Sequence, residues 1–159
     1  MSDNLVVKNI ISTFAKKNIT MAVIAIINGP NLNLLGKREP EVYGSVSFDD
    51  YYLQLKSLFP QVEFRLFQSN VEGELVTMIQ QQGFEVDGIV LNAAAYTHTS
   101  IAIADAVAAV PAPVVEVHIS NVYRREEARH HSLLQAAAVG SIVGFGLQSY
   151  ELAVRALLK

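Results

Sequence analysis

The segment Ala22-Val-Ile-Ala-Ile-Ile27 decides the fold, because it is a short and nearly continuous run of β-branched and small apolar residues. Such a run is typical of a strand that is covered on both faces, as strands of a parallel sheet are. The run stops at Asn28-Gly-Pro30, where we expect the chain to turn at the edge of the sheet. The segment therefore indicates a layered α/β protein.

The rest of the chain alternates between strand and helix patterns. Further strands are expected at residues 61–67, 88–91, 113–117 and 141–145, and helices at 47–59, 72–82, 100–110 and 149–158. Ser47 is the expected N-cap of the first helix, and Gly83 is the expected C-cap of the second. This alternation implies βαβ units, so we expect an α/β fold: a flavodoxin-like, doubly wound, five-stranded parallel sheet with helices on both faces. The pattern leaves the strand order open.

Length and composition point to one folded domain. The chain has 159 residues, of which 51% are hydrophobic and 17% are charged, enough for a single core. We expect residues 21–159 to form that domain, and residues 1–20 to be an N-terminal extension, either a short helix or flexible. This extension lacks the uninterrupted apolar centre of a secretory signal. No apolar run approaches the roughly 20 residues that span a bilayer.

The charge and the missing cysteines exclude several classes of function. A net charge of −3 without a basic cluster argues against binding to nucleic acid. The absence of cysteine excludes disulfide scaffolds, thiolate zinc sites and cysteine nucleophiles. We therefore expect a cytoplasmic protein with neither membrane nor nucleic-acid partners.

Reactive and polar side chains gather in the loops that follow the first, third and fourth expected strands. These loops contain Asn28, Asn31, Arg38, Tyr43, Asn92, His98, His118, Ser120, Asn121, Arg125 and Arg129. The loops at the opposite edge, such as 83–87, are short and plain. Ligands of such folds bind beyond the carboxyl ends of the strands. The concentration of reactive side chains in the loops at this edge therefore predicts an active site there.

Arg38 and Tyr43 form a candidate base. A lone tyrosine in a polar loop is usually surface packing, but Arg38 lies five residues before this one, and Pro40 and Gly44 restrict the path between them. Tyrosine has a pKa of about 10, so it needs a nearby cation to act as a phenolate base near neutral pH. An arginine supplies that charge without competing for the proton.

The histidines allow both structural and chemical interpretations. His118 ends an apolar strand, where a hydrogen-bonded core histidine is as good an interpretation as a catalytic one. His98 lies among Thr97, Thr99 and Ser100, any of which could cap the next helix. Helix capping therefore accounts for these neighbours but not for the histidine itself. His130-His131 does not indicate a metal site, because adjacent side chains point apart and no set of ligands with suitable spacing is near.

Several long motifs together resemble the type II 3-dehydroquinate dehydratase family. The matching segments are Asn28-Gly-Pro-Asn-Leu-Asn-Leu-Leu-Gly36, Arg38-Glu-Pro-Glu-Val-Tyr-Gly44, Gln68-Ser-Asn-Val-Glu-Gly-Glu-Leu75, Tyr96-Thr-His-Thr-Ser100 and Glu116-Val-His-Ile-Ser-Asn121. They occur in the family's order, and the resemblance runs from about Met21 to the C-terminus. It implies that residues 21–159 are a single catalytic domain.

The resemblance implies a lyase that works without a metal or an organic cofactor. It eliminates water from 3-dehydroquinate in the anti sense to give 3-dehydroshikimate, a step of the shikimate pathway of aromatic amino acid biosynthesis or of quinate breakdown. By the family pattern, Tyr43 removes a proton from the carbon beside the ketone, and Arg38 lowers the pKa of Tyr43. Asn31 stabilises the enolate through an ordered water. His118, oriented by Glu116, protonates the departing hydroxyl.

The remaining site residues also come from the family pattern. The groups implied to hold the substrate's carboxylate and hydroxyls are Asn92, His98, Ile119, Ser120 and Arg129. Arg125 assists beside the tyrosine, and Asp105 reaches the site of a neighbouring subunit. The resemblance further implies a homo-oligomer, a homododecamer built from trimers.

Two departures from the family pattern and two alternative functions remain. Ala93-Ala94 stands where the family usually has a glycine or proline, and Ala128 replaces an aromatic residue before Arg129.

One alternative is a non-catalytic flavodoxin-like module that binds a small molecule. The other is a related lyase that acts on another cyclic hydroxy acid.

Overall fold

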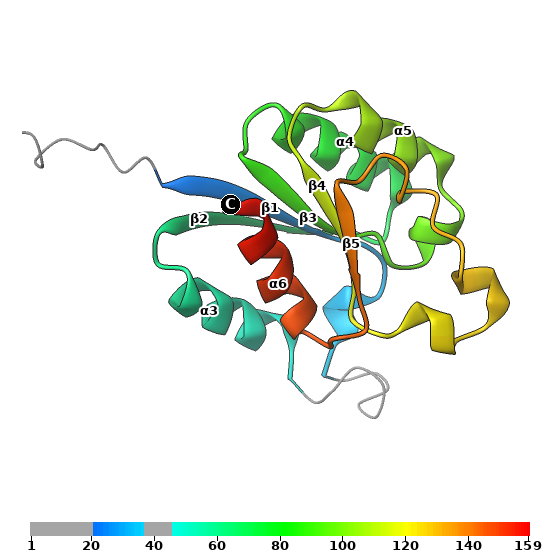
Figure 1. Ribbon diagram of the computed structural model, residues 1–159, viewed down its shortest axis with the longest axis horizontal. Coiled ribbons are helices and arrows are strands. Elements are labelled where there is room, and N and C mark those ends of the chain that lie inside the picture. The colour runs from blue at the N-terminus through cyan, green and yellow to red at the C-terminus, as the bar shows by residue number, and fades with distance from the viewer. Residues whose placement is uncertain (1–20, 37–45) are drawn as a thin grey trace, which may run out of the picture.

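The chain forms a five-stranded, all-parallel sheet in the order β2-β1-β3-β4-β5 (Figure 1). The computed structural model describes residues 21–36 and 46–159. The strands are β1 (Ala22–Asn28), β2 (Val62–Gln68), β3 (Gly88–Asn92), β4 (Val114–His118) and β5 (Gly140–Val143). This order is that of a flavodoxin-like fold, so the predicted fold class is confirmed. The expected N-terminal extension, 1–20, lies outside the described residues.

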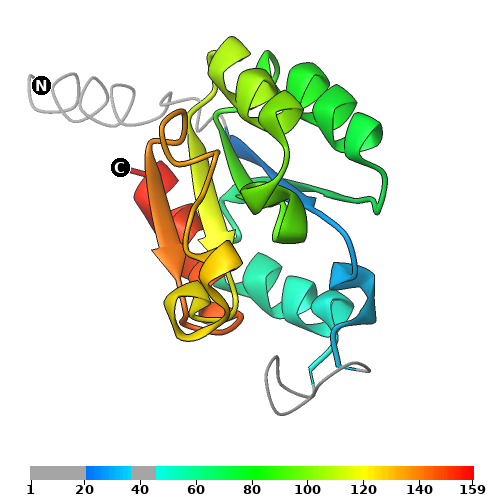
Figure 2. The ribbon, with the colours of Figure 1, turned by 90° about the vertical axis from the view of Figure 1, so that its right-hand side faces the viewer.

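Four helices cover the two faces of the sheet. They are α3 (Phe48–Leu58), α4 (Glu72–Gly83), α5 (Ile101–Ala109) and α6 (Gln148–Leu157). Figures 1 and 2 show α3 and α6 on one face and α4 and α5 on the other. Each pair buries its own apolar cluster against the sheet, for example Leu55 of α3 on one side and Ile79 of α4 on the other. The domain is thus a three-layer sandwich with two cores.

Each of the four helices begins and ends within one residue of its expected bounds, and the structure confirms Ser47 as an N-cap. Ser47 caps α3 by accepting a hydrogen bond from the backbone N of Asp50 at 3.1 Å, and Ser100 caps α5 in the same way through Ile103 at 2.9 Å. The predicted C-cap role of Gly83 is wrong, because Gly83 is the last residue of α4 and Phe84 follows it. Gly83 is instead a packing position, since a Cβ there would lie 2.4 Å from Cβ of Val110.

Strand β5 is shorter than predicted. It ends at Val143 because Gly144 adopts a left-handed conformation with φ of 92°, which breaks the ladder to β4. Gly144 N still donates to the carbonyl of His118, the last residue of β4, at 3.1 Å. The carboxyl end of β4 is therefore held in place by the turn after β5.

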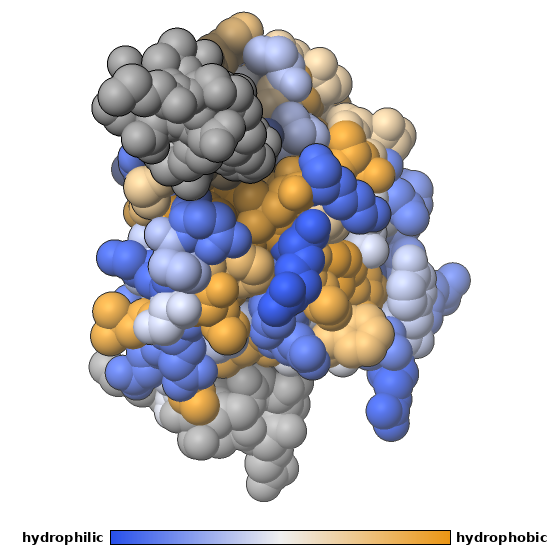
Figure 3. All heavy atoms as spheres, turned by 60° about the vertical axis from the view of Figure 1, so that its left-hand side comes forward, coloured by the Kyte–Doolittle hydropathy of each residue, from blue (hydrophilic) through white to orange (hydrophobic). Residues whose placement is uncertain are grey.

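On the face drawn in Figure 3, hydrophobic and hydrophilic residues are interspersed. Several large apolar side chains of the described residues are well exposed, among them Phe84 (70%), Ile101 (67%) and Val139 (66%). In the described part of the chain, no helix has the length and apolar character needed to cross a membrane.

Candidate active site

A cavity opens at the carboxyl edge of the sheet, where the loops after β1, β3 and β4 converge. Its described lining consists of Pro30, Asn31, Leu32, Leu34, Leu35, Asn92, Ala94, Ala95, His98, His118, Ile119, Ser120, Val122, Arg125 and Arg129. The parallel register explains the convergence, since Asn28 pairs with Asn92 across β1 and β3, and Leu91 pairs with Glu116 across β3 and β4. Strands that end at the same edge deliver their loops to one place.

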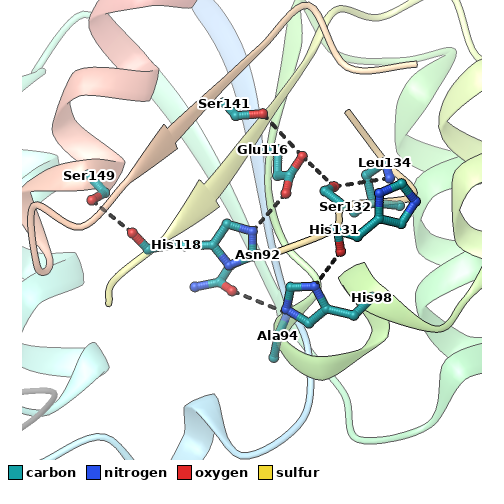
Figure 4. A network of polar contacts seen from close by, with 10 residues as sticks. All are labelled: Asn92, Ala94, His98, Glu116, His118, His131, Ser132, Leu134, Ser141 and Ser149. Atoms are coloured by element: carbon teal, nitrogen blue, oxygen red, sulfur yellow. Dashed lines mark hydrogen bonds and ion pairs between the residues drawn. The ribbon is translucent and has the colours of Figure 1, made fainter. Parts of the chain in front are cut away.

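Glu116 and His118 form a buried hydrogen-bonded pair at the end of β4. They are two residues apart on one strand, so their side chains share a face of the sheet. His118 Nε2 donates to Glu116 Oε1 at 2.7 Å, and the side chains are only 7% and 2% exposed (Figure 4). This bond assigns one ring nitrogen of His118 and leaves Nδ1 as the nitrogen available to a ligand.

Glu116 is also held by two serines. The hydroxyls of Ser132 and Ser141 donate to its second carboxylate oxygen at 2.9 and 3.1 Å (Figure 4). Burial by itself opposes ionisation, but the hydrogen bonds and the charge interaction with His118 outweigh it and lower the pKa of Glu116 below its ordinary value. Glu116 is therefore a carboxylate at neutral pH, suited to stabilise a protonated His118.

His98 lies against His118. The ring centroids are 6.0 Å apart with an interplanar angle of 19°, and His98 Nδ1 donates to the backbone O of His131 at 2.7 Å. Burial lowers the pKa of His98, and the nearby His118 and Arg129 add to this effect. His98 is thus neutral at pH 7, with Nε2 as an acceptor.

Asn92 is anchored at both ends of its amide. Its Nδ2 donates to the hydroxyl of Tyr150 at 2.9 Å, and its Oδ1 accepts from the backbone N of Ala94 at 3.2 Å. The Tyr150 hydroxyl in turn donates to Asn28 Oδ1 at 2.8 Å. Asn28, Asn92 and Tyr150 are all buried, so the amide of Asn92 is presented to the cavity from a rigid base.

Asn31 stands at the entrance of the short helix η1 (Leu32–Leu34). It has a left-handed backbone with φ of 68°, a conformation that asparagine tolerates better than most residues, and its backbone N donates to Asn70 Oδ1 at 2.9 Å. Together these features hold Asn31 at the cavity wall beside the apolar Leu32 and Leu35.

Two arginines bring positive charge to the cavity from the turns after β4. Arg129 ends the short helix η4 (Glu127–Arg129), and its Nε donates to Glu126 Oε1 at 2.5 Å. Arg125 Nε lies 3.6 Å from Glu126 Oε2. The hydrogen bond from Arg129 lowers the pKa of Glu126 to about 2. One carboxylate outside the cavity thus orders both cations, a lining that suits an anionic ligand.

The structure brings most of the predicted site residues together. Those that line one cavity are Asn31, Asn92, His98, His118, Ile119, Ser120, Arg125 and Arg129, with Glu116 directly behind His118. Asp105 is exposed on α5 and is not among the described residues that line this cavity. Arg38 and Tyr43 lie outside the described residues. In the described chain, no three His, Asp or Glu side chains group as metal ligands.

The two departures from the family pattern have different structural settings. Ala94 adopts a left-handed backbone with φ of 52°, which explains why a glycine would suit this turn. The turn beside Asn92 forms nonetheless, because Asn92 Oδ1 accepts from Ala94 N. Ala128 is exposed in η4, where Arg129 is held by Glu126.

Sequence reasoning missed four supporting residues: Ser132, Ser141, Ser149 and Tyr150. Ser149 donates to the His118 carbonyl at 3.1 Å, and the other three bind Glu116 or the asparagines. No motif marked them. The available signal was that a tyrosine in the apolar face of the last helix needs a partner for its hydroxyl.

Comparison with known proteins finds one family and several similar proteins. The family model described as dehydroquinase class II matches residues 22–158. A protein of an Exiguobacterium species named 3-dehydroquinate dehydratase is 55% identical over 137 residues, covering 86% of this chain and 94% of that protein. One of the same name from Chlorobaculum tepidum is 52% identical over 141 residues, covering 85% and 93%.

A solved structure also resembles the chain. The type II dehydroquinase of Butyrivibrio crossotus superposes with a TM-score of 0.82 at 43% identity, covering 87% of this chain and 98% of that one. These matches confirm the resemblance drawn from the sequence motifs. The fold agrees with that of this solved structure, and the chain belongs to the class II dehydroquinase family.

Proposed function

We propose that this chain dehydrates 3-dehydroquinate to 3-dehydroshikimate by anti elimination through an enolate, without a metal or organic cofactor. The observation that carries the proposal is the buried Glu116–His118 pair on a cavity lined by arginines and neutral donors. Family membership supports the same reaction, since relatives of 55% and 52% identity are named 3-dehydroquinate dehydratase. The reaction is a step of the shikimate pathway.

The first chemical step removes a proton from the carbon next to the ketone. Tyr43 accepts this proton as a phenolate, and Arg38 makes the phenolate accessible by stabilising its charge. The electron pair of the broken C–H bond becomes the enolate, which Asn31 stabilises through an ordered water. Arg125 assists beside the tyrosine.

The second step expels the hydroxyl. The enolate electrons re-form the ketone and a carbon–carbon double bond, while the carbon–oxygen bond breaks and His118 donates a proton so that water departs. Glu116 supports this role, because a carboxylate on Nε2 stabilises the imidazolium whose Nδ1–H is the acid. Proton exchange with water returns Tyr43 and His118 to their starting states.

The remaining lining binds the substrate. Arg129 and the Ile119–Ser120 segment suit its carboxylate. Asn92 and His98 suit its hydroxyls, since Nε2 of neutral His98 can accept a hydrogen bond from a hydroxyl. A cavity with cations and neutral donors favours an anionic substrate and an enolate over a neutral ligand.

We also propose a homo-oligomer, a homododecamer built from trimers, located in the cytoplasm. Asp105 lies on the exposed side of α5 together with Ile101, four residues away on the same helix face and 67% exposed. An exposed acid beside an exposed apolar side chain fits a subunit contact that delivers Asp105 to a neighbour's site.

The test is to mix the purified chain with 3-dehydroquinate and follow the ultraviolet absorbance of the conjugated product. Rising absorbance that survives chelator treatment supports the proposal. No absorbance at any pH would favour a flavodoxin-like binding module, and turnover of another cyclic hydroxy acid alone would favour a related lyase. Borohydride added with substrate should not inactivate the chain, because no imine with a lysine forms.

A further inference from the structure

Three buried polar side chains form a continuous hydrogen-bonded chain at the base of the cavity. Asn28 (1% exposed), Asn92 (3%) and Tyr150 (0%) come from the ends of β1 and β3 and from the first turn of α6. Asn28 and Asn92 are register partners, and the Tyr150 hydroxyl lies between their amides. Of the three, Asn92 lines the cavity.

The direction of every bond in this chain is determined. An amide nitrogen can only donate, so the Tyr150 oxygen accepts from Asn92 Nδ2 and must give its single proton to Asn28 Oδ1. Asn92 Oδ1 is assigned independently, because the backbone N of Ala94 can only donate to it. One Nδ2 hydrogen of Asn92 is used by Tyr150, and the second is left for a ligand.

Tyr150 itself has no freedom to move away. Its ring packs edge-on against Phe48 with centroids 5.0 Å apart, and it lies tilted against the Tyr51 ring with centroids 6.2 Å apart. Burial also raises the pKa of the Tyr150 hydroxyl above its ordinary value, so the hydroxyl keeps its proton across the working pH range. The ring thus carries one hydroxyl to a fixed point between two strands.

We propose that Tyr150 is a positioning residue for substrate binding: its hydroxyl holds the Asn92 amide so that the second Nδ2 hydrogen points to the substrate. The inference rests on the proposed function, which gives Asn92 its contact with substrate. Tyr150 lies 58 residues from Asn92 in sequence, so the inference gives the C-terminal helix a role in the substrate affinity of the site.

Tyr150→Phe removes this hydroxyl and keeps the ring. Without it the Asn92 amide can rotate, so we expect KM for 3-dehydroquinate to rise roughly tenfold, the size of one lost hydrogen bond, with kcat changed by less than about twofold. A purely structural role gives a different result, because partial unfolding lowers the amount of active enzyme and leaves KM unchanged.

Tyr51→Phe is the matched control. It deletes the same atom from a buried tyrosine in the same cluster, and the Tyr51 hydroxyl bonds to no side chain of the described chain. Its KM should equal that of the wild type. A rise of KM in Tyr51→Phe as large as in Tyr150→Phe would overturn the proposal, because any lost hydroxyl in this core would then suffice.

A double variant tests whether Tyr150 acts through Asn92. In the Asn92→Ala background, Tyr150→Phe should add no further change in KM. A full additional rise would overturn the proposal, as would an unchanged KM in Tyr150→Phe alone. If wild type and Tyr51→Phe lack turnover, the proposed function fails; if both turn over and only the expected KM shift is missing, the positioning role fails.

Discussion

Two buried polar clusters support the cavity, and they differ in charge. At the end of β4, Glu116, His118 and two serines form a cluster around a carboxylate. At the ends of β1 and β3, Asn28, Asn92 and Tyr150 form a cluster of neutral groups. The first cluster contains groups that can exchange a proton, whereas the neutral groups of the second cluster only fix one another's orientation.

The difference shows that one sheet edge can carry a proton-transfer site and a substrate-binding site with different supporting groups. A general acid needs a counter-ion that remains ionised when buried, and the three donors around Glu116 secure this. A binding amide needs an orientation that does not depend on pH, and neutral partners secure that. The predictions below act on one cluster at a time.

The largest effect is expected from His118→Ala. Loss of the general acid should lower kcat by about 10²–10⁴-fold while the protein stays folded. Steady-state kinetics and a melting curve check this. His131→Ala is the matched control, because the His131 side chain is exposed and only its backbone carbonyl contacts His98; near-equal losses in both variants would remove His118 from the chemistry.

Glu116→Gln keeps the shape of the charged cluster and removes its charge. We expect kcat to fall by about 10–100-fold, a part of the effect of general acid catalysis. Because folding lowers the pKa of Glu116 from its ordinary 4.5, its ionisation stabilises the wild type above that pH, and this contribution is lost as the pH falls through and below it. The stability advantage of wild type over Glu116→Gln, measured by denaturant unfolding, should therefore stay nearly constant well above this pH and shrink as the pH falls below it. An advantage that grows toward pH 4 would contradict the assignment.

Tyr150→Phe probes the neutral cluster through stability. It leaves two buried atoms, Asn28 Oδ1 and Asn92 Nδ2, without their partner, so the free energy of unfolding should fall by about 1–3 kcal/mol. Unlike the loss in Glu116→Gln, this loss should be the same at pH 5 and pH 8, because burial raises the pKa of Tyr150 further above this range. A loss that varied strongly with pH would mean that the two clusters are not separate.

The smallest effect is expected from Ala94→Gly, beside Asn92. Ala94 holds a left-handed φ of 52°, which costs an L-residue about 1 kcal/mol. After the lost methyl contact and the greater chain entropy of glycine are subtracted, the variant should gain about 0.5 kcal/mol of stability. Ala95→Gly, at an ordinary φ in the same turn, should lose stability instead. The same sign for both variants would show that backbone strain does not decide the result.

The two clusters also differ in how far the sequence could predict them. Glu116 and His118 are two residues apart at the end of an apolar strand, so a local pattern places both on one face. Tyr150 could not be assigned in this way, because its partner Asn28 is 122 residues away and only the packing of α6 under the sheet brings them together. Ser132 and Ser141 were missed for the same reason.

For the fold, too, local features were predictable from the sequence and long-range ones were not. The strand and helix pattern predicted the elements, since burial on both faces leaves a continuous apolar run. The strand order could be read only from the structure. The packing role of Gly83 was also not predictable, because it depends on the close approach of Val110, which is distant in sequence, and not on the residues next to Gly83.

The central claim is that a base and a separate acid, His118, act on opposite sides of the bond that forms. The direct test is the product obtained from 3-dehydroquinate that carries deuterium at one of the two hydrogens of the methylene next to the ketone, analysed by NMR. The anti elimination proposed here removes the hydrogen on the side opposite the departing hydroxyl, so only substrate labelled there should lose its deuterium. Loss of deuterium from the same side as the hydroxyl would contradict the mechanism.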